Sequence, residues 1–454
     1  MTSSPEQPAN DGLPLPRRIF AVIAIALGIA MAVLDGAIAN VALPAIARQL
    51  QVTSVASIWV VNAYQLTIVM TLLAFAALGD IIGYRRVYMA GLAVFTLASL
   101  ACALAGDLPV LVATRVLQGL GAAGMMSVNT ALVRFIYPRR LIGQGVGINA
   151  MVVAVSAVIG PSIAAGILAI GDWPWLFAVN LPVGLAALVF ARHLPVTQGS
   201  GRSFDLTGAL LNAATFGLLI TAIDGFAHGG SEGGISLQII VAIGIGLVLV
   251  RRQSQHPAPL LPVDLLLRPM FALSIAASIC AFSGQMLAFV SLPFHLQGEL
   301  HRSQLETGLL MTPWPLAVTV IAPLAGRLAD RYPAGVLGGI GLTVFAAGLG
   351  LLATLPADPG NLEIAWRMAV CGAGFALFQS PNNRTIIASA PVARSGGASG
   401  MLGMARLLGQ STGAALVALA FGRFPAIGTA VSLWTGVGFA LAAALFSGLR
   451  PRRI

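Results

Sequence analysis

Two charged residues, Asp35 and Arg115, lie inside long apolar runs of the chain. An ionisable side chain within a bilayer is energetically costly, so it is a functional hypothesis by default. Burial favours the protonated form of a carboxyl group, whereas a nearby guanidinium favours the ionised form. A carboxyl group under both influences can gain and lose a proton when the conformation changes. We predict that Asp35 serves proton or substrate coupling beside Arg115; the alternative is a structural pair that only holds helices together.

The predicted depths of these two residues agree. With a rise of about 1.5 Å per helical residue, Asp35 lies about 24 Å from the cytoplasmic start of its apolar run. Arg115 lies about 9 Å from the outer end of its own run. In a hydrocarbon core about 30 Å thick, both residues fall in the outer half, where they can pair.

The composition places the chain in a membrane. It is 57% hydrophobic and 9% charged, with a mean hydropathy of +0.91, whereas a soluble domain has about 25% charged residues. Only helices and closed barrels satisfy their backbone groups in lipid, and long continuous apolar runs favour helices. The expected fold class is therefore an all-α membrane protein.

Fourteen transmembrane helices are predicted. They cover 19–42, 57–78, 87–105, 109–134, 145–168, 175–191, 206–224, 235–250, 271–293, 306–325, 334–355, 364–384, 397–421 and 428–449. Of the 25 basic residues, all arginine, two (Arg115 and Arg406) fall within spans when the amino terminus is cytoplasmic. Four then lie outside (Arg48, Arg302, Arg367 and Arg423), and the other nineteen lie in cytoplasmic segments. By the positive-inside rule, both termini are expected in the cytoplasm and the protein in the cell (inner) membrane.

An acidic and arginine-rich motif occurs twice, once after the second span at 78–86 and once after the tenth at 326–331. The separation of Asp80 and Asp330 exceeds the length of six spans by roughly 60 residues, which is the length of the segment 205–265 with its two spans. The predicted organisation is a cytoplasmic tail at 1–18, a six-helix bundle at 19–191, a linker with two extra transmembrane helices at 192–270, a second six-helix bundle at 271–449 and a cytoplasmic tail at 450–454.

These repeated motifs are candidate gates. An acid at a helix end can bond to free amide groups and pair with arginine, and such clusters can latch one conformation and release another. The alternative is a plain solvated loop. A proline among small residues in the fifth span indicates a bending, close-packed interface, or a merely structural kink. The predicted gating residues are Asp80, Gly83, Arg85, Arg86, Gly160, Pro161, Asp330 and Arg331.

Polar, aromatic and sulfur side chains within the spans indicate an internal cavity. A wide and mostly apolar pocket with few polar groups suits lipophilic ligands, and flexible methionine suits varied ones. The predicted substrate-binding residues are Asn40, Asn62, Gln65, Gln118, Phe282, Gln285, Met286, Trp314, Phe378 and Gln379. Arg406, near mid-depth, could bear on an anionic substrate or tie helices together through backbone carbonyls, and both interpretations stay open.

The sequence lacks the motifs that are typical of several other classes of function. The sequence has no phosphate-binding loop and no hydrolase motif, and Cys102, Cys280 and Cys371 have no metal-ligand spacing. We therefore expect no enzyme, no metal and no cofactor, with a proton gradient as the energy source. The expected partners are a small-molecule substrate, protons and the lipid bilayer, with no nucleic acid. A membrane enzyme or a receptor without transport is disfavoured.

The segments Leu34–Pro44, Trp59–Tyr64, Arg115–Gly119, Gly160–Pro161, Trp173–Gly184 and Phe378–Asn383 resemble motifs of the major facilitator superfamily, specifically its fourteen-span drug:proton antiporter branch. The resemblance implies two six-helix bundles plus two inserted helices, alternating access, a monomer and multidrug efflux of lipophilic or cationic molecules. It also implies a role for Arg115 in proton coupling. The alternative is a narrow-specificity exporter or importer of a single metabolite.

The sequence also departs from the motifs of that branch. In the first loop motif, Ala76, Ile81 and Tyr84 replace a glycine and two arginines, which weakens the predicted amino-half latch. Ala164 and Ala165 replace a double glycine, so antiport is less firmly implied than export. The carboxyl half has no clear buried acid, which argues against dedicated export of dications.

Overall fold

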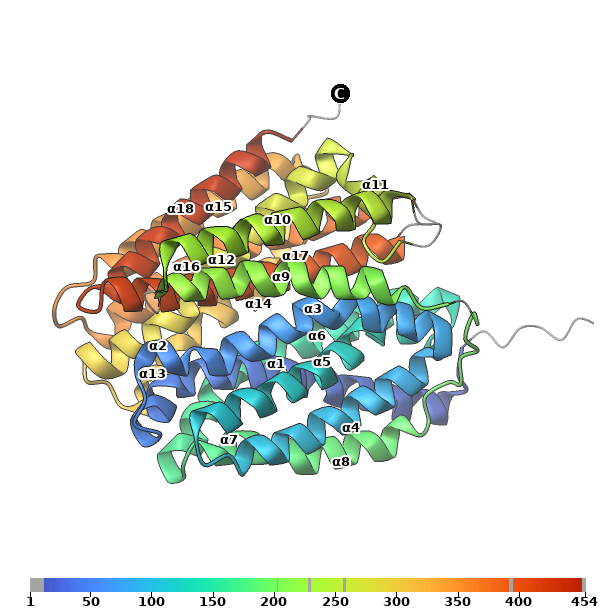
Figure 1. Cartoon of the computed structure of the whole chain (residues 1–454), viewed down its shortest axis with the longest axis horizontal. Helices are drawn as coiled ribbons and strands as arrows, with labels where there is room; N and C mark the ends of the chain where they lie inside the picture. Colours follow the sequence, from blue (N-terminus) through green and yellow to red (C-terminus); the bar gives the residue numbers. More distant parts are fainter. Residues whose placement is uncertain (1–11, 202, 228–229, 256–258, 392–394, 451–454) are drawn as a thin grey trace, which may run out of the picture.

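The computed structural model describes residues 12–201, 203–227, 230–255, 259–391 and 395–450, and the regular elements within these ranges are helices. In the part of the chain that the structure describes, thirteen helical segments are long and apolar enough to span a bilayer, by length and composition. The chain is therefore a multi-pass membrane protein. The helices run roughly side by side in Figure 1.

The amino-terminal helices form one group, in the lower part of Figure 1. They are α1 (Leu15–Gln49), α2 (Ser54–Ser57), α3 (Trp59–Ile82), α4 (Tyr84–Ala103), α5 (Leu108–Ile136), α6 (Ile142–Ile170), α7 (Pro174–Ala178) and α8 (Asn180–Ala191). Helix α5 packs against α3 and α4, while α1 packs against α6 and α8. This arrangement places α1, α4, α5 and α8 around a shared interior.

The carboxyl-terminal helices form a second group, in the upper part of Figure 1. They are α11 (Val263–Leu266), α12 (Pro269–Phe294), a π-helical turn (His295–Glu299), α13 (Gln304–Met311), α14 (Pro313–Leu328), α15 (Ala334–Ala353), α16 (Asn361–Ser389), α17 (Ser395–Arg423) and α18 (Gly428–Gly448). Helix α12 packs against α17 and α18, and α16 packs against α14 and α15.

Two further helices, α9 (Leu206–Ala227) and α10 (Glu232–Gln255), lie beside the seam between the groups (Figure 1). Helix α9 packs against α3 of the first group, α17 of the second group and its neighbour α10. The predicted domain boundaries stay predictions. Most of the predicted amino-terminal tail (residues 1–11) and most of the predicted carboxyl-terminal tail (residues 451–454) lie outside the described residues. Two arginines counted in the predicted charge bias, Arg202 and Arg394, also lie outside them.

The predicted count of fourteen spans is not confirmed. The predicted span 364–384 lies in α16, which is 29 residues long but is not among the thirteen apolar segments. The reason is its polar content, because Glu363, Arg367, Gln379, Asn382 and Arg384 all lie on this helix. The other predicted spans each fall on a helix or on two consecutive helices.

Candidate functional site

A buried ion pair joins two helices of the first group. The guanidinium of Arg115 in α5 donates through Nη1 to Oδ2 of Asp35 in α1. Their side chains are 0% and 1% exposed, so the pair is sealed from solvent in this conformation. The structure thus brings together the two residues that the sequence places at the same depth.

Side chains from α5 and α8 complete the hydrogen bonds of Asp35. Its Oδ1 accepts from Nε2 of Gln118 at 2.8 Å and from Nδ2 of Asn180 at 3.2 Å. Gln118 also donates to Oγ of Ser99 at 2.9 Å. Hydrogen bonds to an ionised acceptor are stronger than neutral ones, so this set stabilises the deprotonated carboxylate.

Arg115 is held separately from its carboxylate. Its Nε donates to the backbone oxygen of Val60 at 2.8 Å, and its Nη1 donates to Oε1 of Gln118 at 2.6 Å. The guanidinium carbon lies 4.3 Å from the ring centroid of Tyr64 and 5.5 Å from that of Phe177. Aromatic faces attract a cation at these distances. The guanidinium is therefore bonded to groups other than Asp35 as well, although its Nη2 is buried with no partner among the described residues.

Small residues explain why these side chains can meet. A Cβ on Gly121 of α5 would lie 2.4 Å from the backbone nitrogen of Phe95 in α4. A Cβ on Gly91 of α4 would lie 2.8 Å from the oxygen of Gly121. The two helices therefore touch backbone to backbone, as small residues permit within membranes. This contact brings Ser99 of α4 to Gln118 of α5.

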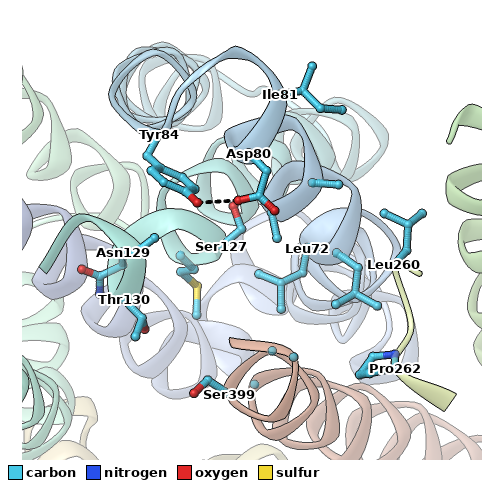
Figure 2. Close-up of a pocket in the computed structure, with 18 of the residues that line it drawn as sticks. Leu72, Asp80, Ile81, Tyr84, Ser127, Asn129, Thr130, Leu260, Pro262 and Ser399 are labelled. Carbon is cyan, nitrogen blue, oxygen red and sulfur yellow. Dashed lines mark hydrogen bonds between the residues drawn. The ribbon is translucent and has the colours of Figure 1, made fainter. Parts of the chain in front are cut away.

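A cavity of about 1030 Å³ opens between the two groups of helices. Its walls include α1, α3 and α5 of the first group, α17 of the second and the segments 198–205 and 259–262. Figure 2 shows Asp80 and Tyr84 hydrogen-bonded on one side of this cavity, with Ser399 of α17 across from them. The cavity lies at the end of the molecule where α3 and α5 finish, since Asp80, Arg134 and Phe135 line it.

A sequence profile of the Major Facilitator Superfamily matches residues 25–414 of the chain and matches again at 273–453. The chain belongs to the Major Facilitator Superfamily. It is therefore a transporter rather than an enzyme. Within the described residues, no group of three or more His, Cys, Asp or Glu residues could hold a metal ion.

Curated relatives extend over most of the chain. It is 58% identical to "Uncharacterized transporter YebQ" of Escherichia coli over 97% of both chains. It is 30% identical to "Riboflavin transporter RibZ" of Clostridioides difficile, covering 87% of this chain and 86% of the relative. It is 32% identical to "Multidrug resistance protein Stp" of Mycobacterium tuberculosis, covering 88% and 75%.

A solved structure supports the fold alone. A bacterial homologue of the lysosomal transporter Spinster, in an inward-facing and unoccupied conformation, matches with a TM-score of 0.69 at 17% identity. The match covers 96% of this chain and 98% of the other. The Major Facilitator fold therefore applies to nearly the whole transporter.

The first predicted gate contacts the segment after α8. Gly83, with φ of 100°, joins α3 to α4, and a Cβ there would lie 2.5 Å from the backbone oxygen of Thr197. Asp80 accepts from the hydroxyl of Tyr84. Arg85 donates to the backbone oxygen of Arg192 at 2.8 Å, and Arg86 to that of Ile82 at 3.4 Å. These arginines therefore bind carbonyl oxygens in this transporter.

The second predicted gate ties helices of the carboxyl-terminal group. Asp330, just after α14, pairs with Arg384 of α16, and both side chains are more than half exposed. Arg331 beside it is exposed. In this conformation, the hydrogen bonds and the ion pair described above stay within one group of helices or its flanking segment. Among the described residues, these contacts do not bridge the cavity.

The third predicted gate lies where the two groups touch, at the end opposite the cavity mouth. A Cβ on Gly308 of α13 would lie 2.4 Å from the backbone oxygen of Pro161 in α6. Nearby, the hydroxyls of Ser162 and Thr312 lie 3.0 Å apart. On the other side of α6, a Cβ on Gly160 would lie 2.7 Å from Cβ of Ala37. Helix α6 is thus in close contact with α1 and with the other group.

The predicted substrate-binding residues fall into separate environments. Phe282, Trp314 and Phe378 belong to a buried aromatic cluster within the second group, with edge-to-face contacts centred on Phe345 and Phe375. Gln118 belongs to the Asp35 cluster, which consists of Asp35, Arg115 and the polar side chains bonded around them, namely Ser99, Gln118 and Asn180. Gln285 and Gln379 are half-buried. None of the ten predicted residues is among those lining the large cavity in this conformation.

Three predicted amides are buried with unused hydrogen-bonding atoms. Asn62 has neither amide atom bonded among the described residues, and Oδ1 of Asn40 and Oε1 of Gln65 also lack partners there. Nε2 of Gln65 lies 3.9 Å from the sulfur of Met286, across the two groups. Buried polar atoms are normally hydrogen-bonded, so such exceptions call for an explanation.

Sequence reasoning missed part of the Asp35 cluster. Ser99 and Asn180 belong to it, and the ring of Tyr64 lies against Arg115. Tyr64 and Asn180 lie in segments that resemble motifs of the superfamily, but the sequence does not assign them a role beside Asp35. Each is a single polar residue in an apolar run, and that signal is shared by many residues facing a helix interface. The sequence does not show which of them point to Asp35.

Proposed function

We propose that this transporter exports lipophilic or cationic small molecules by alternating access, driven by proton entry through Asp35. The observation that carries this proposal is the sealed Asp35–Arg115 pair beside a cavity that is open at one end. Protonation of Asp35 would remove the ionic partner of Arg115. An unpaired buried charge is strongly unfavourable, so protonation would favour a rearranged state of the helices.

The direction of access follows from the arginine bias. If the arginine-rich end is cytoplasmic, then the cavity is open to the cytoplasm and the contact of Gly308 with Pro161 closes the outer side. The ion pair then represents the deprotonated carrier, ready to receive cargo from inside. A proton from outside would reach Asp35 only after the outer contact opens.

The buried amides with unused hydrogen-bonding atoms support a substrate path between the two groups of helices. Asn40, Asn62 and Gln65 lie on α1 and α3, and Gln65 faces Met286 of the other group. Opening of the outer side would separate these groups and expose the amides to water or cargo. Their predicted role in substrate binding thus belongs to a conformation other than the present one.

The name of one relative supports multidrug export, whereas the name of another supports transport of a single metabolite. Stp is named a multidrug resistance protein, whereas RibZ is named a riboflavin transporter. A single-metabolite exporter or importer with the same fold is therefore the second candidate. A panel of chemically unrelated ligands separates the two, because a multidrug exporter would be thermally stabilised by many of them.

The test of proton coupling is transport in everted vesicles with an imposed pH gradient. Lipophilic dyes of positive, neutral and negative charge serve as substrates. The Asp35→Asn variant mimics the protonated carboxyl, so we expect it to lose gradient-driven accumulation while it retains exchange of dye without a gradient.

The matched control is Asp358→Asn, which changes a fully exposed carboxylate. It should transport as the unmodified protein does. Gradient-driven accumulation at the normal rate in Asp35→Asn would show that Asp35 is not the coupling carboxyl. No pH-driven transport of any dye by the unmodified protein would count against proton-driven export itself.

A further inference from the structure

Arg406 brings a guanidinium to the inner part of the large cavity. It lies on the cavity wall eleven residues into α17, or about 16 Å along the helix from its start. Its Nε atom is buried and has no hydrogen-bond partner among the described residues. Within that same part of the chain, no carboxylate lies within ion-pair distance of it. A charge in such a position gains from an anionic partner.

The acids that line the cavity are already engaged elsewhere. Asp80 accepts from Tyr84 at the end of α3. Asp205, just before α9, accepts from Arg252 at 3.0 Å and from Gln253 at 2.8 Å. Partial burial alone would raise the pKa of Asp205, but the amide of Gly208 and these two side chains outweigh it and lower that pKa. Neither carboxylate reaches Arg406.

The buried acid of the first group is also engaged. Asp35 is sealed against Arg115, whose guanidinium lies on the ring of Tyr64. Tyr64 lies within electrostatic range of Asp35, Arg115 and Arg406. Arg115 and Arg406 therefore both lie near Tyr64, and Asp35 is paired with Arg115 rather than with Arg406.

Glycines keep the approach to Arg406 open. Gly397, Gly400 and Gly403 precede it at intervals of three residues and line the same cavity. Successive members of this series lie about one turn apart and wind gradually around α17, and all of them line the cavity. A Cβ on Gly400 or Gly403 would meet its nearest neighbour, Leu73 or Leu72, at 3.8 Å, which is ordinary contact. Packing therefore does not require glycine at either position.

Glycine within a helix costs roughly 1 kcal/mol relative to alanine. Packing does not require these glycines. Their effect is to leave a strip of the cavity-facing surface of α17 without side chains, which we call the lane. The lane leads from the end of the helix to the guanidinium, past the apolar side chains of Leu72 and Leu73. An amphipathic molecule would slide along this lane with its polar group leading.

We propose that Arg406 is the receptor for an acidic group of the cargo, so that the preferred substrates are apolar molecules bearing a carboxylate or similar oxyanion. The planar guanidinium binds such groups through two parallel hydrogen bonds. This inference rests on the proposed export function and narrows it, since it favours acidic over cationic cargo.

The test measures binding to the purified full chain in lipid nanodiscs. The probes are a naphthalene carboxylate and its primary amide, which have similar shape but differ in charge. We expect the unmodified protein to bind the carboxylate at least tenfold more tightly than the amide. The Arg406→Gln variant should weaken binding of the carboxylate alone, so the ratio falls to about one. The Arg406→Lys variant, which keeps the charge, should retain part of the preference.

Two controls sharpen this test. Arg423→Gln removes an exposed arginine from the outer end of the same helix and should leave the ratio unchanged. Gly403→Leu should weaken both probes by obstructing the lane, whereas Gly339→Leu, at a glycine with open space around it, should weaken neither.

Two results would overturn the inference: equal binding of both probes by the unmodified protein, or an unchanged ratio in Arg406→Gln. The first result is measured on the unmodified protein, so it does not depend on whether a variant folds. If the amide is exported in an Asp35-dependent way without preference for the acid, only this inference fails. If the preference depends on Arg406 but Asp35→Asn exports normally, proton coupling fails instead.

Discussion

The Asp35–Arg115 pair is stabilised asymmetrically. Asp35 depends on Arg115 for its ionic partner, with Gln118 and Asn180 as neutral donors. Arg115 also has the oxygen of Val60 and the face of Tyr64. Nη2 of Arg115, however, is buried without a hydrogen-bond partner among the described residues. In the proposed mechanism, protonation of Asp35 would remove the ionic partner of this buried cation, which favours a rearranged state of the helices.

At this scale we predict a non-additive effect on stability. Arg115→Met should lower the free energy of unfolding by about 3–5 kcal/mol, because it leaves a buried carboxylate without its partner. Adding Asp35→Asn should recover a large part of that loss. Denaturant unfolding in mixed micelles measures both values. A double variant no more stable than Arg115→Met alone would contradict the pairing energetics.

In the proposed mechanism, helix α6 is the element on which closure of the outer side depends. It lies against α1 through Gly160 and Ala37, and against α13 through Pro161 and Gly308. Both contacts leave no room for an added Cβ. Because Pro161 lies within a helix of 29 residues, it also removes one internal hydrogen bond and makes bending easier. A tight contact next to a proline is suited to opening and closing as a unit.

We therefore predict that Gly308→Val favours the state in which the outer side is open. The added carbons overlap the oxygen of Pro161 and Cβ of Ala165, so the two groups must separate there and close around the cavity. Spin labels at Thr130 and Ser399, both on the cavity lining, report the change. Their distance by double electron–electron resonance should shorten by several Å, as in alternating-access transitions.

The matched control for this element is Gly339→Val in α15, where an added Cβ meets nothing within 4 Å. Its label distance should equal that of the parent. An unchanged distance in Gly308→Val would mean that the contact with α6 does not govern the conformational equilibrium.

The whole molecule combines two helix groups, a lateral pair of helices and one large open cavity. Helix α9 touches both groups through α3 and α17, so a motion of one group against the other must also move or slide past α9. The arginine bias predicts that the cavity faces the cytoplasm. With that orientation, the conformation would accept cargo from the cytoplasm.

The orientation is testable with single cysteines in a background lacking Cys102, Cys280 and Cys371. A membrane-impermeant maleimide added to intact cells should label Asp358→Cys, which is exposed at the end opposite the cavity. Gln198→Cys, on the cavity rim, should react only after permeabilisation. The reverse pattern would invert the proposed topology.

Hydrophobicity and charge predicted the helices well because lipid imposes a local requirement on each segment. Every apolar run long enough to cross a bilayer must satisfy its own backbone, which a helix does without help from its neighbours. Helix α16 is the informative exception. It carries Glu363, Arg367 and Arg384 along a 29-residue helix, so its composition alone does not distinguish it from a partly aqueous helix.

The sequence by itself determined the membrane location, the helical class, the repeated motifs and the choice of Asp35 and Arg115 as partners at one depth. Only the tertiary structure decided that Gln118, Asn180 and Ser99 join that pair, while Phe282, Trp314 and Phe378 pack with one another. It also decided that Arg406 faces the open cavity. The physical reason is that hydrophobicity fixes depth along a helix, whereas the direction a side chain faces depends on which neighbouring helices pack against it.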